Sequence, residues 1–197
     1  MDLLPKAEDW RLARTVHERF KRRPGSAHIA SVGALSHLAA LLRTERIKSV
    51  LEFGSGIGTV SYLLLASPPK DRRVVSFERN PFCLSQLARN IPQELGARLT
   101  VHEGKTVPDD TFDLVVIDGS VADYSFLRNG QLLFVEGNRA KQRHVVERVA
   151  KERGFACSFH RYPVDGPVLR LKWRRLGAVP IPRLTLRFFC SIAKIGV

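Results

Sequence analysis

The pattern of apolar positions divides the chain into two leading helices and a longer part in which strands alternate with helices. Apolar residues recur at helical spacing over residues 8–21 and 31–46, and "RRPG" separates these two segments. From residue 49 onward, short apolar runs alternate with amphipathic segments. The predicted strands are residues 49–53, 73–78, 97–103, 112–118 and 130–137, and the predicted helices of this part are residues 59–67, 81–91 and 140–154.

Two more strands are predicted near the end of the chain, "FACSFHRY" (155–162) and "VLRLKWRR" (168–175), joined by a turn through "PVDGP". Alternating strands and helices indicate a parallel sheet with helices on both faces, and the tight turn makes the last two strands antiparallel. The sequence therefore predicts one α/β domain with a mostly parallel seven-stranded sheet. Its expected parts are the N-terminal helices (1–46), a core (47–176) and a C-terminal tail (177–197).

Composition narrows the class of protein. The chain has 197 residues, 44% of them hydrophobic, which suffices for a single core. No apolar stretch is long enough to cross a bilayer, and the charged N-terminus lacks the apolar segment of a signal peptide, so we expect a cytoplasmic protein. Cys83, Cys157 and Cys190 are far apart and flanked by apolar residues, which predicts buried free thiols.

The net charge of +13 is concentrated in the last third of the chain. From Arg139 to the end, 14 Lys and Arg residues stand against three acidic ones. Such a surface favours an anionic partner, for example RNA or a phosphorylated substrate, although a simply solvated basic surface is an equal interpretation.

A glycine-rich turn follows the first predicted strand, in "VLEFGSGIGTV" (50–60). Glycine permits positive φ and close approach of a ligand, and a strand–helix turn at this place usually contacts the ligand of an open parallel sheet. A dinucleotide fingerprint would need a glycine at position 59, which is Thr59. The glycines instead follow a G-x-G-x-G spacing, with Glu52 two positions before Gly54.

This segment, "LEFGSGIG", resembles the first motif of the class I S-adenosylmethionine-dependent methyltransferases, and the resemblance extends from about residue 27 to about residue 174. "VVSFE" matches the acidic residue that holds the ribose, "VHEGK" the loop against adenine, and "FDLVVIDGS" the fourth-strand motif. The resemblance implies a Rossmann-like methyltransferase fold that binds S-adenosyl-L-methionine. The cofactor-binding residues that it implies are Glu52, Gly54, Ser55, Gly56, Gly58, Glu78, Arg79, Gly104, Lys105, Asp118, Gly119 and Ser120.

The chemistry of these residues suits that ligand. Glu78 can accept hydrogen bonds from the ribose hydroxyls. The backbone amides near Gly56 and Gly58 are expected to bind the cofactor carboxylate, and Glu52 is expected to offset its positive charges. The competing interpretations are a Glu52 side chain paired with an arginine and a Glu78 side chain on the plain surface.

Within the superfamily, the chain is most similar to the catechol and caffeoyl-type O-methyltransferases. The similarity lies in "HIASVGALSHLAALLRTERIKSVLEFGSGIGTVSYLLL", "IDGSVADY" and "LLFVEGN". It implies a divalent metal, usually magnesium, held by an aspartate of the fourth-strand motif and an aspartate–asparagine pair after the fifth strand. Asp118 matches the first ligand and Glu136 stands for the second, so both are expected to be catalytic.

Several departures from this pattern weaken the expectation of a metal and of a lysine base. Gly137 occupies the third ligand position, Asn138 comes one place too late, and Val121 stands where the catechol enzymes have a basic lysine. The segment "GSVADYSFLRN" is also too short for the usual full helix. A metal-independent reaction and an altered magnesium site both stay open, and we expect transfer without an obligatory tightly bound metal.

Three functions follow from these features. The first is O-methylation of a small molecule, with His28 near the acceptor. The second is methylation of RNA through the basic last third, although no separate RNA-binding module is recognisable. The third is a catalytically degenerate cofactor-binding subunit. For the tail, Pro180 and Pro182 favour core packing or a homodimer contact over a membrane element.

Overall fold

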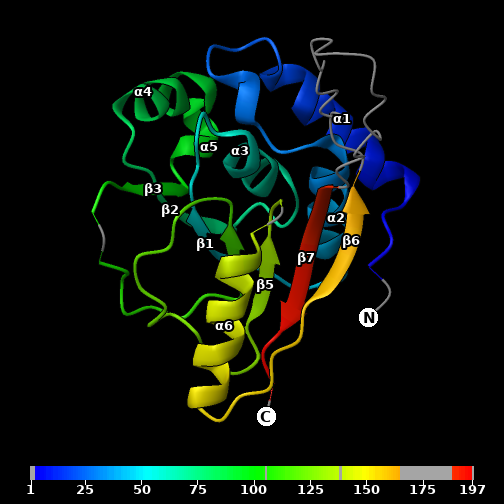
Figure 1. Ribbon diagram of the computed structural model, residues 1–197. Coiled ribbons are helices and arrows are strands. Elements are labelled where there is room, and N and C mark those ends of the chain that lie inside the picture. Colours follow the sequence, from blue (N-terminus) through cyan, green and yellow to red (C-terminus); the bar gives the residue numbers. More distant parts are fainter. Residues whose placement is uncertain (1–2, 105, 138, 165–187, 197) are drawn as a thin grey trace, which may run out of the picture.

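The computed structural model describes residues 3–104, 106–137, 139–164 and 188–196 (Figure 1). Its helices are α1 (Ala7–Phe20), the 3-10 helix η1 (Ser26–His28), α2 (Val32–Thr44), α3 (Thr59–Ala66), α4 (Pro81–Asn90), α5 (Gln93–Gly96) and α6 (Ala140–Glu152). Its strands are β1 (Ser49–Phe53), β2 (Arg73–Phe77), β3 (Leu99–His102), β4 (Leu114–Ile117), β5 (Leu132–Val135), β6 (His160–Val164) and β7 (Phe188–Lys194).

The strands of the described residues form one seven-stranded sheet in the order β3-β2-β1-β4-β5-β7-β6. The first five pair in parallel, and β7 pairs antiparallel with both β5 and β6. The strand order reverses beside β1, which places the carboxyl ends of β1 and β4 next to each other, and a ligand site is expected at such a point. The predicted α/β fold with a mostly parallel seven-stranded sheet is confirmed.

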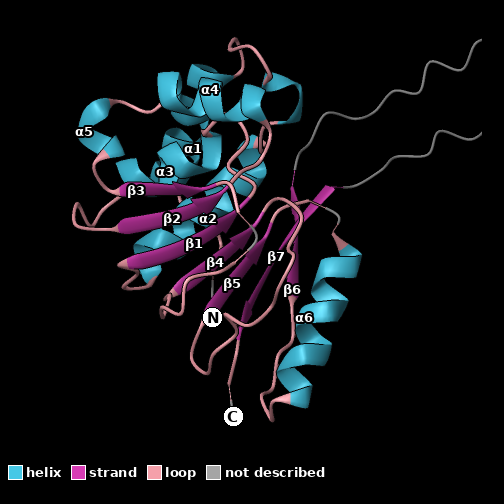
Figure 2. Ribbon diagram, turned by 90° about the vertical axis from the view of Figure 1, so that its left-hand side faces the viewer, coloured by secondary structure: helices cyan, strands magenta, loops and turns pink. Residues whose placement is uncertain are grey.

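The helices cover the two faces of the sheet unequally. Helices α1 to α5 lie on one side and α6 lies on the other (Figure 2). One core fills the space between the sheet and the first group of helices, and includes Phe20, Leu38 and Leu63. A second core on the α6 side includes Phe53, Phe126 and Val146. Because the inner strands are buried on both sides, their sequences are almost continuously apolar.

The predicted closing strand pair needs a correction. The strand that pairs with β6 is β7, inside the segment expected to be a tail, while the predicted strand 168–175 lies outside the described residues. Strand β7 is the inner one of the two: Ile192 packs in the first core and Ala193 in the second. An inner strand needs apolar residues on both faces, and the run "FFCSIAKI" meets that need whereas the alternating pattern of residues 168–175 fits a half-buried strand.

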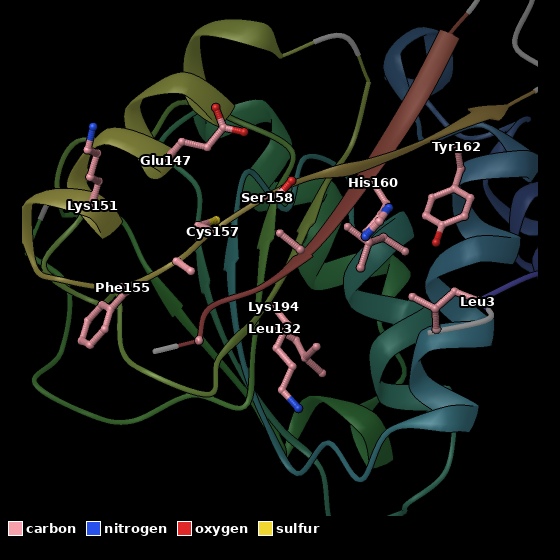
Figure 3. Close-up of a pocket in the computed structure, with 14 residues that line it drawn as sticks. Leu3, Leu132, Glu147, Lys151, Phe155, Cys157, Ser158, His160, Tyr162 and Lys194 are labelled. Carbon is pink, nitrogen blue, oxygen red and sulfur yellow. The ribbon is translucent and has the colours of Figure 1, made fainter.

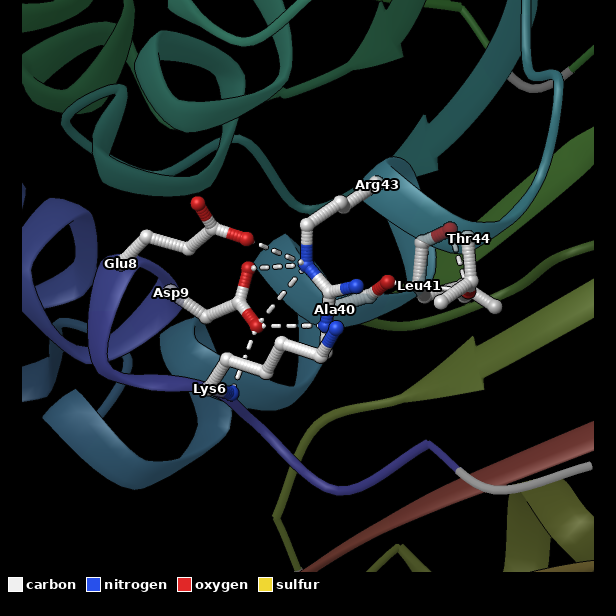
Figure 4. A network of polar contacts seen from close by, with 7 residues as sticks. All are labelled: Lys6, Glu8, Asp9, Ala40, Leu41, Arg43 and Thr44. Carbon is white, nitrogen blue, oxygen red and sulfur yellow. Dashed lines mark hydrogen bonds and ion pairs between the residues drawn. The ribbon is translucent and has the colours of Figure 1, made fainter.

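A polar clamp joins the first two helices (Figure 4). The Asp9 carboxylate, only 3% exposed, accepts hydrogen bonds from the Lys6 backbone amide at 2.8 Å and from Nε and Nη2 of Arg43 at 3.1 and 2.8 Å. Glu8 also lies 3.2 Å from the Arg43 guanidinium. The clamp holds α1 against α2.

The cysteines and the lengths of the helices bear on two further predictions. Cys83, Cys157 and Cys190 are free thiols, but only Cys190 is buried as predicted, since Cys83 and Cys157 are half-buried. Burial raises the pKa of Cys157 to about 11 and of Cys190 to about 12. Among the described residues, the helices are too short or too polar for any of them to traverse a lipid bilayer.

Candidate functional site

A cleft of about 460 Å³ opens at the carboxyl ends of β1, β2 and β4. This is the position where an open parallel sheet binds its ligand. Most of the residues that the sequence analysis assigned to a cofactor come together here. Those that line the cleft are Gly54, Gly56, Glu78, Arg79, Gly104, Asp118, Gly119 and Ser120. Lys105 lies outside the described residues.

The three glycines of the loop after β1 are required for different structural reasons. Gly54 has φ +90°, and a Cβ there would lie 2.8 Å from the Cα of Gly119. Gly58 has φ +99° and its Cβ would lie 2.7 Å from the side chain of Leu87 on α4, so this glycine allows a helix to pack and does not line the cleft. Gly56 has φ +54° with nothing within 4 Å of its Cβ position. Of the three, only Gly56 has a Cβ position that borders open space.

The amides expected to bind the cofactor carboxylate already have partners. The Gly56 amide donates to Oε2 of Glu78 at 2.8 Å, and the Gly58 amide donates to the Ser55 carbonyl at 2.9 Å. In this structure the loop uses these two donors to hold its own shape.

Glu78 follows β2 and its carboxylate is held by three backbone amides. Oε2 accepts from Gly56, and Oε1 accepts from Arg79 at 2.8 Å and from Asn80 at 2.9 Å. Asn80 in turn caps α4, since its side chain accepts from the Phe82 amide at 3.0 Å. Glu78 is thus a fixed carboxylate on the wall of the cleft and is not a plain surface side chain.

Glu52 lies beneath the loop and does not line the cleft. Its side chain is fully buried, and its Oε2 accepts hydrogen bonds from the hydroxyls of Ser61 at 2.6 Å and Ser76 at 2.8 Å. Burial raises the pKa of Glu52 to about 7, against the lowering effect of the two serines. Its Oε1 has no partner among the described residues. An arginine partner, the alternative weighed from sequence, is not found among the hydrogen bonds and ion pairs of the described residues.

A smaller cavity of about 230 Å³ adjoins the cleft and shares His28, Gly56, Asn80 and Asp118 with it. Ser55 and Thr59 line this cavity at the start of α3. They are 5% and 3% exposed, and within the described part of the chain neither hydroxyl oxygen has a hydrogen-bond partner. Two buried, unpaired hydroxyls beside a cavity are suited to a polar group of a ligand, because leaving them unpaired costs free energy.

Asp118 and Arg139 form an ion pair at the other end of the cleft. Nη2 of Arg139 lies 2.8 Å from Oδ1 of Asp118 and also donates to the Asp118 carbonyl. Burial, and then the nearby Glu136 carboxylate, raise the pKa of Asp118 well above its usual value, while Arg139 opposes this shift. Glu136 acts on Asp118 from behind, since it does not line the cleft.

The sequences of known proteins do not identify the chain: no family model and no curated protein matches it. Solved structures do match. An O-methyltransferase of Bacillus cereus in complex with S-adenosylhomocysteine is 16% identical, with a TM-score of 0.58 over 98% of this chain and 93% of that one. The Streptomyces achromogenes O-methyltransferase TomG, involved in tomaymycin synthesis and solved with S-adenosylmethionine, is 17% identical, with a TM-score of 0.59 over 98% and 92%. The chain has the methyltransferase fold.

The same fold is shared by proteins of other substrate classes. A candidate RNA methyltransferase of Pyrococcus horikoshii is 16% identical, with a TM-score of 0.54 over 97% of this chain and 98% of that one. The methyltransferase fold thus accounts for the closing strand pair and for the cleft at the carboxyl ends, and it leaves the acceptor undetermined.

The described residues do not provide a metal site of the kind that the resemblance implied. No group of three His, Cys, Asp or Glu side chains suited to a metal occurs among them. Asp118, the one carboxylate of the implied set that lines the cleft, is paired with the Arg139 guanidinium. Asn138 lies outside the described residues. A donor set of one paired aspartate and one glutamate behind it does not fit a resident magnesium ion, which needs near-octahedral oxygen coordination.

A larger cavity, of about 790 Å³, lies elsewhere in the molecule (Figure 3). It is bordered by Leu132 at the start of β5, Lys194 at the end of β7, and side chains such as Phe155 and His160. None of the residues assigned to the cofactor lines it. The position at the carboxyl ends of the parallel strands, and not the volume, therefore distinguishes the functional cleft.

Sequence reasoning missed some residues of the cleft and only touched on others. Asn80 and Ala122 line it and were not expected, whereas His28 was expected near the acceptor and does line it. Arg139 was expected as a polar residue near the strand ends and as a cation that could screen Asp118 and Glu136, and it lines the cleft and pairs with Asp118. The signal for Asn80 was available in "ERNP", where an asparagine before a proline marks the start of a helix directly after Glu78.

Proposed function

We propose that this protein is an S-adenosylmethionine-dependent methyltransferase that acts on an oxygen atom of a small molecule. The observation that carries the proposal is the cleft at the carboxyl ends of β1 and β2, in which the fixed Glu78 carboxylate stands next to the open face of Gly56. An anchored acceptor of hydrogen bonds beside bare backbone is suited to a ribose with two hydroxyl groups.

The residues around the two cavities fit the other parts of the cofactor. The unpaired hydroxyls of Ser55 and Thr59 supply polar partners for its amino acid end in the smaller cavity. Phe77 and Gly104 supply an apolar surface and a bare backbone near the ends of β2 and β3 for its base. Glu52 places a buried carboxyl group beneath the loop. When bound, the cofactor supplies an electrophilic methyl group on a positively charged sulfur.

The chain's own contribution to transfer is positioning and charge. Asp118 and Ser120 line the cleft just after β4, which β1 separates from β2 and Glu78, and His28 also lines the cleft. An acceptor held beside Asp118 therefore lies at the end of β4. Asp118 lines the cleft, and Glu136 does not line it but raises the pKa of Asp118. We assign a functional role to both residues. Methyl transfer depends mainly on the alignment of nucleophile, carbon and sulfur, and a conspicuous base is not required.

A second candidate is methylation of RNA, favoured by the charge of α6. Lys141, Arg148 and Lys151 are exposed on this helix, and a row of cations attracts phosphates. The similarity to the Pyrococcus horikoshii protein adds to this candidate. A binding titration at increasing salt distinguishes it, because phosphate contacts give a steep loss of affinity.

One experiment tests both candidates. The purified protein is incubated with S-adenosylmethionine labelled in the methyl group, and with either a small-metabolite extract or total RNA. We expect label in the small molecules. Label confined to RNA would replace the first proposal by the second. Failure of S-adenosylhomocysteine to bind in calorimetry would overturn both.

A further inference from the structure

The guanidinium of Arg139 stands at the point where the resemblance places a metal. Asp118 matches the first metal ligand of the catechol-type enzymes, and in this structure its Oδ1 and its carbonyl both accept from Nη2 of Arg139. Both side chains line the cleft. The positive charge next to Asp118 is therefore supplied by the protein itself.

Arg139 has hydrogen-bonding capacity left over. Its Nε is buried and finds no partner among the described residues, while its side chain as a whole is 30% exposed. A guanidinium presents its N–H groups in a planar fork that matches oxyanions. Since Arg139 lines the cleft, the exposed part of this fork is open to an oxygen of a ligand, whereas the buried Nε is out of its reach.

The surroundings of Arg139 carry charges of both signs. Arg139 is the N-cap of α6, whose first turn contains Lys141 and Arg143 and no acidic residue. The helix N-terminus carries a partial positive charge, which is normally offset by acidic side chains. Here the offsetting carboxylates come from other elements: Asp118, which pairs with Arg139, and Glu136 beside it.

No lysine lines the described part of the cleft to take a proton from the acceptor. Val121, at the position of the basic lysine in the catechol enzymes, packs against the second core. An acceptor that reacts here must reach the site already ionised, or must ionise into the open cleft.

We propose that Arg139 is a catalytic residue that binds the reacting oxygen of the acceptor as an anion, in place of a divalent metal. This inference rests on the proposed function. Asp118 is then a positioning residue, because it orients the guanidinium and does not itself touch the acceptor oxygen. The acceptors are compounds whose reacting oxygen is an anion near neutral pH, and neutral alcohols are excluded.

The step balances without a co-reactant. The hydroxyl proton leaves to solvent, the oxygen anion forms the new bond to the methyl carbon, and the carbon–sulfur bond breaks with its electron pair passing to sulfur. One negative charge and one positive charge are lost together. Arg139 favours the ionised acceptor before this step and releases the neutral product after it.

Several charged groups surround Arg139 and bear on any pH dependence. They are Asp118 at the end of β4, Glu136 at the end of β5, Arg143 in the first turn of α6, and His28, Glu78 and Arg79 in the same cleft. The test therefore follows the ionisation of the acceptor and not that of a protein group.

The probe is 4-nitrophenol, whose phenolate absorbs visible light. Its absorbance is recorded against pH with protein saturated in S-adenosylhomocysteine, for the wild type, Arg139→Gln, Arg139→Lys and Arg14→Gln. Arg14 is a control arginine, exposed on α1, that lines neither the cleft nor the smaller cavity. We expect the wild type and Arg14→Gln to shift half-ionisation to lower pH by about one unit or more, which is a tenfold change. The shift should vanish in Arg139→Gln and be partial in Arg139→Lys.

A second readout compares two acceptors that share a 4-nitrophenyl ring, 4-nitrophenol and 4-nitrobenzyl alcohol, with labelled S-adenosylmethionine. We expect label in the phenol only, with about a tenfold or greater loss of kcat/KM in Arg139→Gln. Absence of a spectral shift in the wild type, its persistence in Arg139→Gln, or equal labelling of the alcohol would each overturn the inference. Calorimetry with S-adenosylhomocysteine verifies that each variant is folded. If the wild type itself does not bind it, the proposed function fails, which is a separate outcome.

Discussion

Gly54 and Gly119 stand back to back where β1 and β4 end, and neither position has room for a side chain. A Cβ on Gly54 would lie 2.8 Å from the Cα of Gly119, and a Cβ on Gly119 would lie 2.9 Å from the Cα of Gly54 and 3.1 Å from the Phe53 carbonyl oxygen. The floor of the cleft is therefore bare backbone from two parallel strands, and its depth depends on both glycines.

Gly119→Ala should therefore destabilise the protein. The added methyl meets backbone, which cannot rotate away, so we expect a loss of about 1–3 kcal/mol in the free energy of unfolding, measured by urea denaturation. Gly96→Ala is the matched control, because nothing lies within 4 Å of its Cβ position. Equal stability of Gly119→Ala and the wild type would show that the two strand ends separate easily.

Gly56→Val tests the open face of the loop. Because nothing lies within 4 Å of the Cβ position, the variant should fold, at a cost of about 1–2 kcal/mol for a side chain at φ +54°. Its affinity for S-adenosylhomocysteine should fall at least about tenfold in calorimetry, or about 1.4 kcal/mol. Gly154→Val has the same kind of backbone strain, at φ +77°, away from the cleft. If both variants bind equally well, the loop does not contact the ligand.

Glu78→Ala should weaken cofactor binding by about 1.5–3 kcal/mol, the usual range for a hydrogen bond to a charged group. The same change also deprives the amides of Gly56, Arg79 and Asn80 of their acceptor, so the loop loosens. Asp71→Ala, exposed at the opposite end of β2, serves as the control. A crystal structure with the cofactor bound and Glu78 directed to bulk solvent would contradict the assignment.

The raised pKa of the buried Glu52 carboxyl predicts a specific dependence of the protein's stability on pH. Its pKa in the folded protein is about 7, above the ordinary value of 4.5, so the folded state holds the proton more tightly than the unfolded state. The free energy of unfolding should then fall by about 3 kcal/mol as the pH rises from about 4.5 to about 7, and level off above.

Glu52→Gln keeps the shape of the side chain and removes the proton equilibrium, so its stability should lack this decline. Glu94→Gln, on the exposed surface of α5, should behave as the wild type does. Urea titrations at a series of pH values measure the difference. Parallel pH curves for Glu52→Gln and the wild type would show that Glu52 ionises as freely inside the protein as outside.

Chelator treatment tests the absence of a resident metal. Since Arg139 already pairs with Asp118, we expect methyl transfer to proceed at an unchanged rate after dialysis against a chelator. Loss of activity that magnesium alone restores would mean that the two carboxylates, Asp118 and Glu136, hold a metal once substrate is present.

Much of the fold was predictable because each inner strand is a short, almost wholly apolar run. The sequences of β1, β2, β4 and β5 leave no doubt about burial on both faces, and the helices between them follow from the helical spacing of apolar residues. The glycine loop and Glu78 were also recognisable, since their residue types and their position after strands are local properties of the chain.

Strand β7 was not predictable, because its apolar run is as consistent with a packed tail as with an inner strand. The segment forms a strand because it pairs with the edge of β5 that β4 leaves open, for example Lys194 with Leu132, although the two segments are far apart in the sequence. Main-chain pairing across such a distance has no local signal.

The sequence by itself determined the class of fold, the glycine loop and the acidic residue after β2. Only the tertiary structure decided how these groups are used: Glu78 is fixed by Gly56, 22 residues earlier, and Arg139 pairs with Asp118, 21 residues earlier. Both contacts join the ends of neighbouring parallel strands, and which ends are neighbours depends on the strand order of the whole sheet. A side chain's partner across a sheet is set by that order, which no short stretch of sequence contains.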